Sequence, residues 1–226
     1  QMVANLSEIK LMSVEKNLKE IKDSIPSQVT LVAVSKTYPA EVVMEAYHAG
    51  QRVFGENKVQ ELCEKRDQMP DDVEWHLIGH LQTNKVKYIA PFVSMIHSID
   101  SLKLLQEVNK YAHRYDRVIN CLLQIHIAQE ETKFGLSFEE CTELLISNEF
   151  KALKNIRVVG LMSMASNTED TSQIRKEYRS LKEFYDKQPS LYILSIGMSG
   201  DYKIAIEEGS TMIRVGSSIF GKRNYA

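Results

Sequence analysis

The sequence predicts an α/β fold of the (β/α)8 or TIM-barrel type, with a single domain over residues 1–226 and an extra N-terminal helix. A chain of 226 residues with 43% hydrophobic and 26% charged residues can bury one core and keep a hydrated surface. Eight short apolar runs alternate with segments of helical periodicity, which is typical of parallel βαβ units. The runs are mostly apolar throughout, as in strands covered on both faces, and eight of them favour a closed barrel over an open sheet.

An amphipathic helix is expected ahead of the first strand, over residues 5–25. Apolar residues that include Val14, Leu18 and Ile21 recur there at mostly three- and four-residue spacing, and Pro26 follows the pattern. Only residues 217–226 follow the last predicted strand, too few for a full closing helix. The N-terminal helix is therefore expected either to take part of that position or to cover one end of the barrel.

The eight predicted strands are rich in β-branched and other apolar residues. They cover residues 30–35, 52–54, 75–79, 94–99, 118–128, 156–164, 191–197 and 211–216.

Several segments between these strands carry helix signals. Pro39 fits the first position of a helix, and Gly50 fits the left-handed position after its end. Ser137 and Glu140 have the spacing of a capping box, and Gly209 is expected to end a short helix. A further helix is predicted after the polar loop 167–170, where apolar residues recur at helical period: Ile174, Tyr178, Leu181 and Phe184.

Composition argues against several classes of partner. Lys plus Arg number 28 and Asp plus Glu number 30, so a net charge of −2 provides no general attraction to nucleic acid or to an anionic membrane. The longest apolar runs, 31–34 and 158–162, are too short to span a bilayer, and no basic-then-apolar leader begins the sequence. A cytoplasmic protein is expected. Its three scattered cysteines, Cys63, Cys121 and Cys141, are expected to be reduced and mostly buried.

Lys36 is the first candidate for chemistry. Strand alternation places Val32, Val34 and Lys36 on one face, so the amine would lie at the end of an apolar row that points into the barrel. Desolvation there favours the neutral amine that a Schiff-base lysine needs. The alternative is a lysine whose ammonium extends from the strand end into solvent.

Two loops form a candidate anion site. TIM barrels often bind phosphate with the loops after strands seven and eight, through backbone N–H groups and a helix N-terminus. Here residues 197–201 (GMSGD) and 214–218 (RVGSS) follow those strands and supply small residues and hydroxyls. Glycine and serine are also common in ordinary turns, which is the alternative for either loop taken alone.

The histidines are weaker candidates. His76 and His80 are four residues apart, but one lies in a strand and the other in the following turn, so they do not form a helical metal pair. His97 and His126 are interpreted as hydrogen-bonded core residues, and Lys222 as a solvated surface charge.

Six motifs resemble those of the pyridoxal phosphate homeostasis proteins, a family of small single-domain proteins. The motifs are AVSKT (33–37), FGEN (54–57), WHLIGHLQTNK (75–85), GLMSM (160–164), LSIGMSGD (194–201) and RVGSSIFG (214–221). The resemblance covers nearly the whole chain in the same order. It implies a barrel like the N-terminal domain of alanine racemases and of eukaryotic ornithine decarboxylases, with pyridoxal 5′-phosphate (PLP) at its mouth.

The resemblance also implies a role for particular residues. Lys36 would form the internal aldimine with PLP, Arg214 would face the pyridine nitrogen, and Asn57 would lie close by. The phosphate would be held by four residues of the last two loops: Ser199, Gly200, Gly216 and Ser217.

An arginine opposite the ring nitrogen keeps that nitrogen unprotonated, which makes the ring a weaker electron sink. Alanine racemases add a catalytic tyrosine from a second domain of a partner subunit, and 226 residues leave no room for such a domain. The resemblance therefore implies a monomeric PLP-binding protein of vitamin B6 homeostasis without turnover, with PLP-dependent apo-enzymes as candidate partners. Two alternatives remain: a single-domain PLP-dependent amino-acid racemase, and a phosphate-binding Schiff-base aldolase.

Two positions depart from the family pattern. Lys58 stands where many relatives have an aromatic residue, and His80 replaces a proline found in some members. Neither belongs to the implied contacts with PLP, but Lys58 could change the charge at the barrel mouth.

Overall fold

The computed structural model describes residues 6–131 and 134–222 of the chain. Its parallel strands form one closed barrel in sequence order, in which the last strand is hydrogen-bonded to the first. The predicted (β/α)8 barrel is therefore confirmed. The strands are β1 (Thr30–Val34), β2 (Val53–Glu56), β3 (Glu74–Leu77), β4 (Met95–Ile99), β5 (Ile119–Gln124), β6 (Ile156–Met162), β7 (Ile193–Ser195) and β8 (Met212–Val215).

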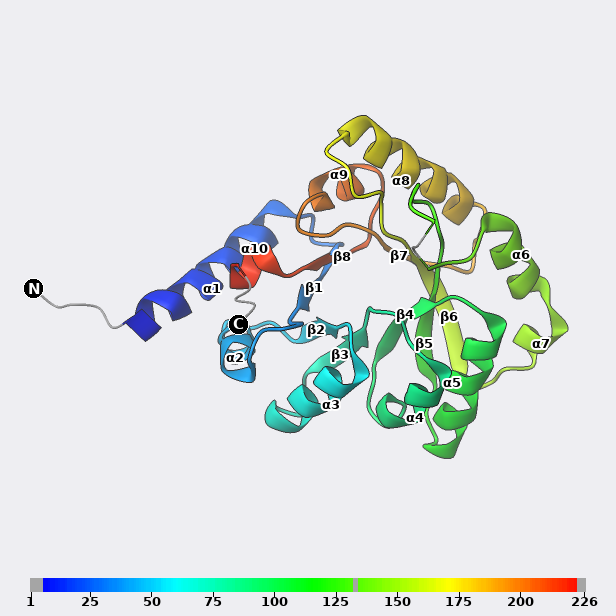
Figure 1. Cartoon of the computed structure of the whole chain (residues 1–226), viewed down its shortest axis with the longest axis horizontal. Coiled ribbons are helices and arrows are strands. Elements are labelled where there is room, and N and C mark those ends of the chain that lie inside the picture. Colours follow the sequence, from blue (N-terminus) through cyan, green and yellow to red (C-terminus); the bar gives the residue numbers. More distant parts are fainter. Residues whose placement is uncertain (1–5, 132–133, 223–226) are drawn as a thin grey trace, which may run out of the picture.

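Helices surround the barrel on the outside (Figure 1). A single 3-10 turn, Thr83–Lys85, precedes the short helix after β3. The α-helices are α1 (Leu6–Ser24), α2 (Ala40–His48), α3 (Val59–Gln68), α4 (Val86–Ile89), α5 (Leu102–Arg114), α6 (Phe138–Ile146), α7 (Asn148–Lys151), α8 (Thr171–Asp186), α9 (Tyr202–Glu207) and α10 (Ser217–Phe220).

Helix α1 packs beside α10 and α2, where a full closing helix would otherwise lie (Figure 1). Val14 and Leu18 are almost fully buried there, and the Asn17 side-chain amide donates to the Ile219 carbonyl at 3.0 Å. Because α10 is only four residues long, α1 covers apolar surface that α10 leaves open. Of the two positions expected for the N-terminal helix, the structure shows the first.

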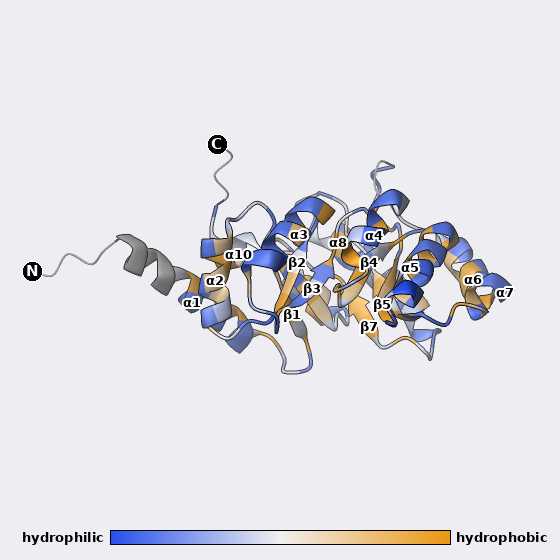
Figure 2. Cartoon of the chain, turned by 90° about the horizontal axis from the view of Figure 1, so that it is seen from below, coloured by the Kyte–Doolittle hydropathy of each residue, from blue (hydrophilic) through white to orange (hydrophobic). Residues whose placement is uncertain are grey.

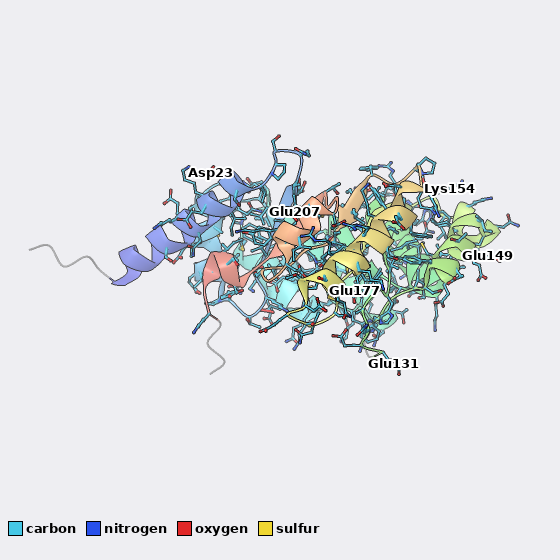
Figure 3. All side chains as sticks on the ribbon, turned by 90° about the horizontal axis from the view of Figure 1, so that it is seen from above. Asp23, Glu131, Glu149, Lys154, Glu177 and Glu207 are labelled. Atoms are coloured by element: carbon cyan, nitrogen blue, oxygen red, sulfur yellow. The ribbon has the colours of Figure 1, made fainter. Side chains whose placement is uncertain are left out.

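The apolar core has two layers. The larger layer fills the space between strands and helices, and a smaller cluster inside the barrel includes Val32, Leu122 and Met162. Figure 2 shows the same division, with hydrophobic strands inside and hydrophilic outer faces on the helices. Exposed charged residues such as Asp23, Glu149 and Lys154 lie on the periphery (Figure 3).

Most of the helix signals are confirmed. Ser137 and Glu140 form a complete capping box at the start of α6, and Gly50 adopts a φ of +102° just after α2. Gly209 has a φ of +106° two residues after the end of α9. Pro39 differs slightly from the prediction, because it is the N-cap residue of α2 and not its first helical residue.

The strand boundaries are narrower than predicted at β7. Residues 191–197 were expected to be extended, but β7 covers only Ile193–Ser195. Gly197 has a φ of +107°, outside the β region, so the chain turns there into the loop that precedes α9. An added Cβ would lie 2.8 Å from the Cβ of Ala205, so this tight turn has room only for glycine.

The cysteines are free, with Cys121 and Cys141 buried and Cys63 half-buried, as expected. None of the helices over residues 6–131 and 134–222 combines the length and apolar character needed to cross a bilayer.

Candidate functional site

A cavity of about 780 Å³ lies where the strands end at their carboxyl edge. Its volume falls within the usual range for small-molecule sites. All seven residues selected from the sequence line it: Lys36, Asn57, Ser199, Gly200, Arg214, Gly216 and Ser217.

Lys36 reaches the cavity through the alternation of β1. Val32 belongs to the apolar cluster inside the barrel, and Val34 and Lys36 line the cavity above it. The prediction that these three residues share one face is therefore confirmed. Lys36 is half-buried and lines the cavity.

A buried ion pair fixes the backbone just before Lys36. The Lys65 ammonium lies 2.7 Å from Glu56 Oε1 and also donates to the Ser35 carbonyl, and the Ser35 hydroxyl donates to the same Glu56 oxygen at 2.6 Å. Glu56 is fully buried and Lys65 is 5% exposed. Burial raises the pKa of Glu56 to about 7, although Lys65 and Ser35 oppose this shift.

Helix α3, which carries Lys65, also fixes the backbone just after Lys36. The Thr37 N–H donates to Glu61 Oε2 at 2.8 Å, and Lys65 lies 3.1 Å from that same oxygen. Thr37 has a φ of +69°, a conformation that a β-branched residue rarely adopts without support. The charged face of α3 thus holds the segment of Lys36 from both sides. Sequence reasoning missed this cluster.

The loops after β7 and β8 are joined to each other. The Gly216 N–H donates to the Ser199 hydroxyl at 3.3 Å. The first loop is also held by Asp201, whose two carboxylate oxygens accept from the Met198 N–H at 2.8 Å and from the Tyr178 hydroxyl at 2.9 Å. The two loops therefore form one structural unit at the cavity wall.

Arg214 forms part of the cavity wall and is 3% exposed. Its Nη1 donates to the carbonyl and hydroxyl of Ser195, and its Nη2 donates to the Ser163 carbonyl at 3.0 Å. Burial lowers the pKa of Arg214 from its ordinary value, but an arginine remains protonated at neutral pH. No carboxylate among the described residues forms an ion pair with it within 4 Å, although the charge of Asp201 is near enough to oppose the lowering of its pKa.

Asn57 is positioned by a close approach of two loops. A Cβ added to Gly79 would lie only 2.4 Å from the Asn57 carbonyl oxygen and 2.7 Å from its Cα. The absence of a side chain at Gly79 therefore allows the backbone after β2 to contact the backbone after β3. This contact places Asn57 and Gly79 side by side on the cavity wall.

Sequence reasoning missed several wall residues. The Phe134 ring stacks on His80, with ring centroids 3.9 Å apart and planes 11° apart, and both residues line the cavity. Phe134 lies in the long loop between β5 and α6, where no strand end marked it as a site residue. Lys222 is exposed, as expected, and it also lines the cavity.

The charge of the cavity has one sign. Its described lining residues include three cations, Lys36, Arg214 and Lys222, and no aspartate or glutamate. Hydroxyls and backbone N–H groups of the loops after β7 and β8 add further donors. The cavity is therefore suited to an anionic ligand.

The histidine pair singled out in the sequence does not come together. His76 points into the barrel and lies 2.9 Å from His97, whereas His80 stacks on Phe134 at the cavity mouth. Over the part of the chain that the structure describes, no group of three or more His, Cys, Asp or Glu side chains could hold a metal ion.

The barrel and its cavity define the class of protein: residues 9–224 match the family model described as alanine racemase, N-terminal domain. The chain is 42% identical over 202 residues to a pyridoxal phosphate homeostasis protein of Aquifex aeolicus, covering 86% of this chain and 87% of that protein. It is 38% identical over 237 residues to the Vibrio alginolyticus protein of the same name, covering 96% and 100%. The chain therefore belongs to the family of pyridoxal phosphate homeostasis proteins.

A solved structure extends this comparison to the fold. PipY of Synechococcus elongatus, determined with PLP bound, superposes with a TM-score of 0.84 and is 33% identical, covering 92% of this chain and 100% of PipY. The curated relatives are named as homeostasis proteins and not as enzymes.

Proposed function

We propose that this protein binds pyridoxal 5′-phosphate in the cavity at the carboxyl end of its barrel and serves in the cellular homeostasis of PLP. One observation carries the proposal: Lys36, Arg214 and the joined loops after β7 and β8 line a single cavity whose described lining contains no carboxylate. The family and the PLP-bound relative point to the same ligand.

The residues present fit the chemical groups of PLP. When bound, PLP supplies an aldehyde that condenses reversibly with a lysine amine and releases one water. Lys36 is the amine on the cavity wall, and the segment around it is held by α3. Ser199, Gly200, Gly216 and Ser217 would bind the phosphate through hydroxyl and backbone donors. Arg214 would donate to the ring nitrogen, with Asn57 beside the ring.

The positive charge of Arg214 determines what the bound cofactor can do. A guanidinium donates a hydrogen bond but does not give up its proton at neutral pH, so a ring nitrogen facing it stays unprotonated. The ring then withdraws electrons weakly, which disfavours carbanion chemistry. This supports a protein that holds and releases PLP and does not turn over amino acids.

The decisive experiment compares Lys36→Ala with Lys58→Ala. Lys58 is exposed and lies one residue beyond Asn57, outside the cavity lining, so it is a matched control. The wild type and Lys58→Ala should take up PLP, show its visible absorbance, and gain its mass on Lys36 after borohydride reduction. Lys36→Ala should lose the absorbance and the adduct. A wild type that takes up no PLP would contradict the proposal.

An activity assay separates the enzyme alternative. Racemisation of an amino acid faster than by free PLP, and lost in Lys36→Ala, would favour a single-domain racemase. The proposal expects no such excess.

The proposal also covers the domain organisation, cellular location, oligomeric state and partners of the protein. We infer a single PLP-binding domain over residues 1–226, because the family match covers residues 9–224. Residues 1–5, 132–133 and 223–226 of that domain lie outside the described structure. We also infer a cytoplasmic monomer that supplies PLP to apo-enzymes. Its free cysteines are consistent with a reducing compartment. Light scattering, cell fractionation and PLP transfer to an apo-enzyme test these three points.

A further inference from the structure

A column of buried polar side chains extends from Arg214 into the barrel. The Arg214 Nη1 contacts the Ser195 hydroxyl on β7, this hydroxyl lies 3.0 Å from His97 Nδ1 on β4, and His97 Nε2 lies 2.9 Å from His76 Nδ1 on β3. Ser195 and His97 are 0% exposed, and His76 is 3% exposed. These three residues do not line the cavity, so the column lies below the cavity wall.

The hydrogen bonds of the column can be assigned a direction. Arginine only donates, so the Ser195 oxygen accepts from Arg214. Among the described residues, the one remaining hydrogen-bond contact of that hydroxyl is with His97 Nδ1. The hydroxyl hydrogen therefore has an acceptor only if His97 Nδ1 accepts it. His97 then carries its hydrogen on Nε2 and donates to His76 Nδ1. The chain therefore runs from Arg214 through Ser195 and His97 to His76.

The two imidazoles are neutral at physiological pH. Burial lowers the pKa of His76 to about 4, and burial together with the neighbouring His76 and Arg214 puts the pKa of His97 well below its ordinary value. Arg214 thus provides the one positive charge of the column.

The column also determines which N–H groups of Arg214 remain. Both hydrogens of Nη1 are directed to Ser195, and Nη2 uses one hydrogen for the Ser163 carbonyl. Nε makes no hydrogen bond to the described residues. One hydrogen of Nη2 and the hydrogen of Nε therefore remain available to a ligand. The opposite edge of the guanidinium is held by Ser195, and Arg214 lines the cavity.

We propose that Ser195, His97 and His76 are positioning residues that hold Arg214 in place, so that the cavity selects a ligand whose ring nitrogen is a neutral hydrogen-bond acceptor. The inference rests on the proposed function and adds the reason why the cavity would select one form of the ring nitrogen over another. A pyridine nitrogen with a free lone pair is accepted, and a ring nitrogen that carries a permanent positive charge is disfavoured.

The probe pair is PLP and its N1-methyl derivative, whose ring nitrogen is permanently cationic. The wild type should bind PLP at least about tenfold more tightly than the methylated probe, because a fixed like charge faces the latter. In Ser195→Ala this preference should fall to about threefold or less, because the Arg214 guanidinium loses its hydroxyl acceptor. Both probes retain the aldehyde, so borohydride trapping on Lys36 should persist in the variant.

Matched variants separate positioning from stability. Ser98 is equally buried and adjacent to His97, but its hydroxyl has no hydrogen-bond partner in the described structure, so Ser98→Ala should keep the wild-type preference. His97→Gln can still accept from Ser195 and donate to His76, and should keep more of the preference than His97→Leu. An unchanged preference in both Ser195→Ala and His97→Leu would overturn the proposal.

A measurement without ligand tests the column directly. Nitrogen-15 NMR of the imidazoles should show both His97 and His76 as neutral rings with hydrogen on Nε2, and Ser195→Ala should shift the His97 Nδ1 resonance. Hydrogen on His97 Nδ1 would contradict the proposed direction. This result does not depend on PLP, so it stays decisive even if the wild type fails to bind PLP and the proposed function is wrong.

Discussion

The Lys65 ammonium lies 2.7 Å from a carboxylate oxygen of Glu56, and both side chains are buried beside the segment that carries Lys36. Two charges removed from water cost several kcal/mol each unless they are paired and hydrogen-bonded. Here the Ser35 carbonyl and hydroxyl add hydrogen bonds to the pair through Glu56 Oε1 and Lys65, whereas Glu56 Oε2 has no hydrogen-bond partner among the described residues. The stability of the barrel and the geometry of the cavity therefore depend on the same ion pair.

Removing the cation should destabilise the protein strongly. Lys65→Met leaves the Glu56 carboxylate buried without its charged partner, and should lower the free energy of unfolding by about 3–5 kcal/mol at pH 8. Urea denaturation measures the loss. Lys103→Met, at an exposed lysine on α5, should change it by less than about 0.5 kcal/mol. The double variant Lys65→Met/Glu56→Gln should recover part of the loss, and no recovery would argue against the pair as its cause.

Glu56 should make stability depend on pH between about 4.5 and 7. Its pKa is raised from 4.5 to about 7 in the folded protein, chiefly by burial, so the folded state binds this proton more tightly than the unfolded state. The stabilising contribution is complete below about pH 4.5 and is lost as pH rises to about 7. Relative to Glu56→Gln, the wild type should lose stability over this interval in urea titrations. A wild type that gains stability relative to the variant would show that the shift has the opposite sign.

A negative charge at Ser199 should weaken the retention of PLP. Ser199→Asp places a carboxylate against the proposed phosphate site, and equilibrium dialysis should show at least about tenfold weaker binding. Ser190→Asp is the matched control, because Ser190 is exposed and lies before β7, at the opposite end of the barrel. Equal retention by the two variants would mean that the phosphate lies elsewhere.

Two glycines of the cavity wall should differ in their tolerance of alanine. Gly79→Ala puts a methyl group 2.4 Å from the Asn57 carbonyl oxygen, and should cost about 1–3 kcal/mol of unfolding free energy as the loops move apart. A Cβ at Gly200 meets nothing within 4 Å, so Gly200→Ala should be nearly neutral in stability. Thermal and urea unfolding compare the two variants. Equal losses would show that the close approach of the loops does not limit stability.

The barrel and the main site residues could be predicted because the information is local in the chain. Uninterrupted apolar runs identify parallel strands, and the ends of those strands gather at one edge of the barrel. That geometry made Lys36 and the loops after β7 and β8 candidates, and all of them line one cavity, whereas the individual residue roles came from the family resemblance.

The supporting residues could not be predicted in the same way. Lys65 lies on a helix with many charged residues, where a lysine normally faces solvent, and its burial depends on Glu56 and Ser35 from neighbouring strands. His97 and Ser195 are 98 positions apart and meet only across the barrel interior. Such contacts depend on the exact register of β4 and β7, which periodicity does not provide.

The pairing of β1 with β8 has a consequence for biosynthesis. The amine follows the first strand, and the proposed phosphate loops follow the seventh and eighth, so the ligand would bridge the seam where the barrel closes. The ribosome must have synthesised both β1 and β8 before that seam can form. PLP would then bind only after both strands have been synthesised. Because the bound ligand would contact residues that follow β1, β7 and β8, it would also stabilise the barrel against opening at this seam.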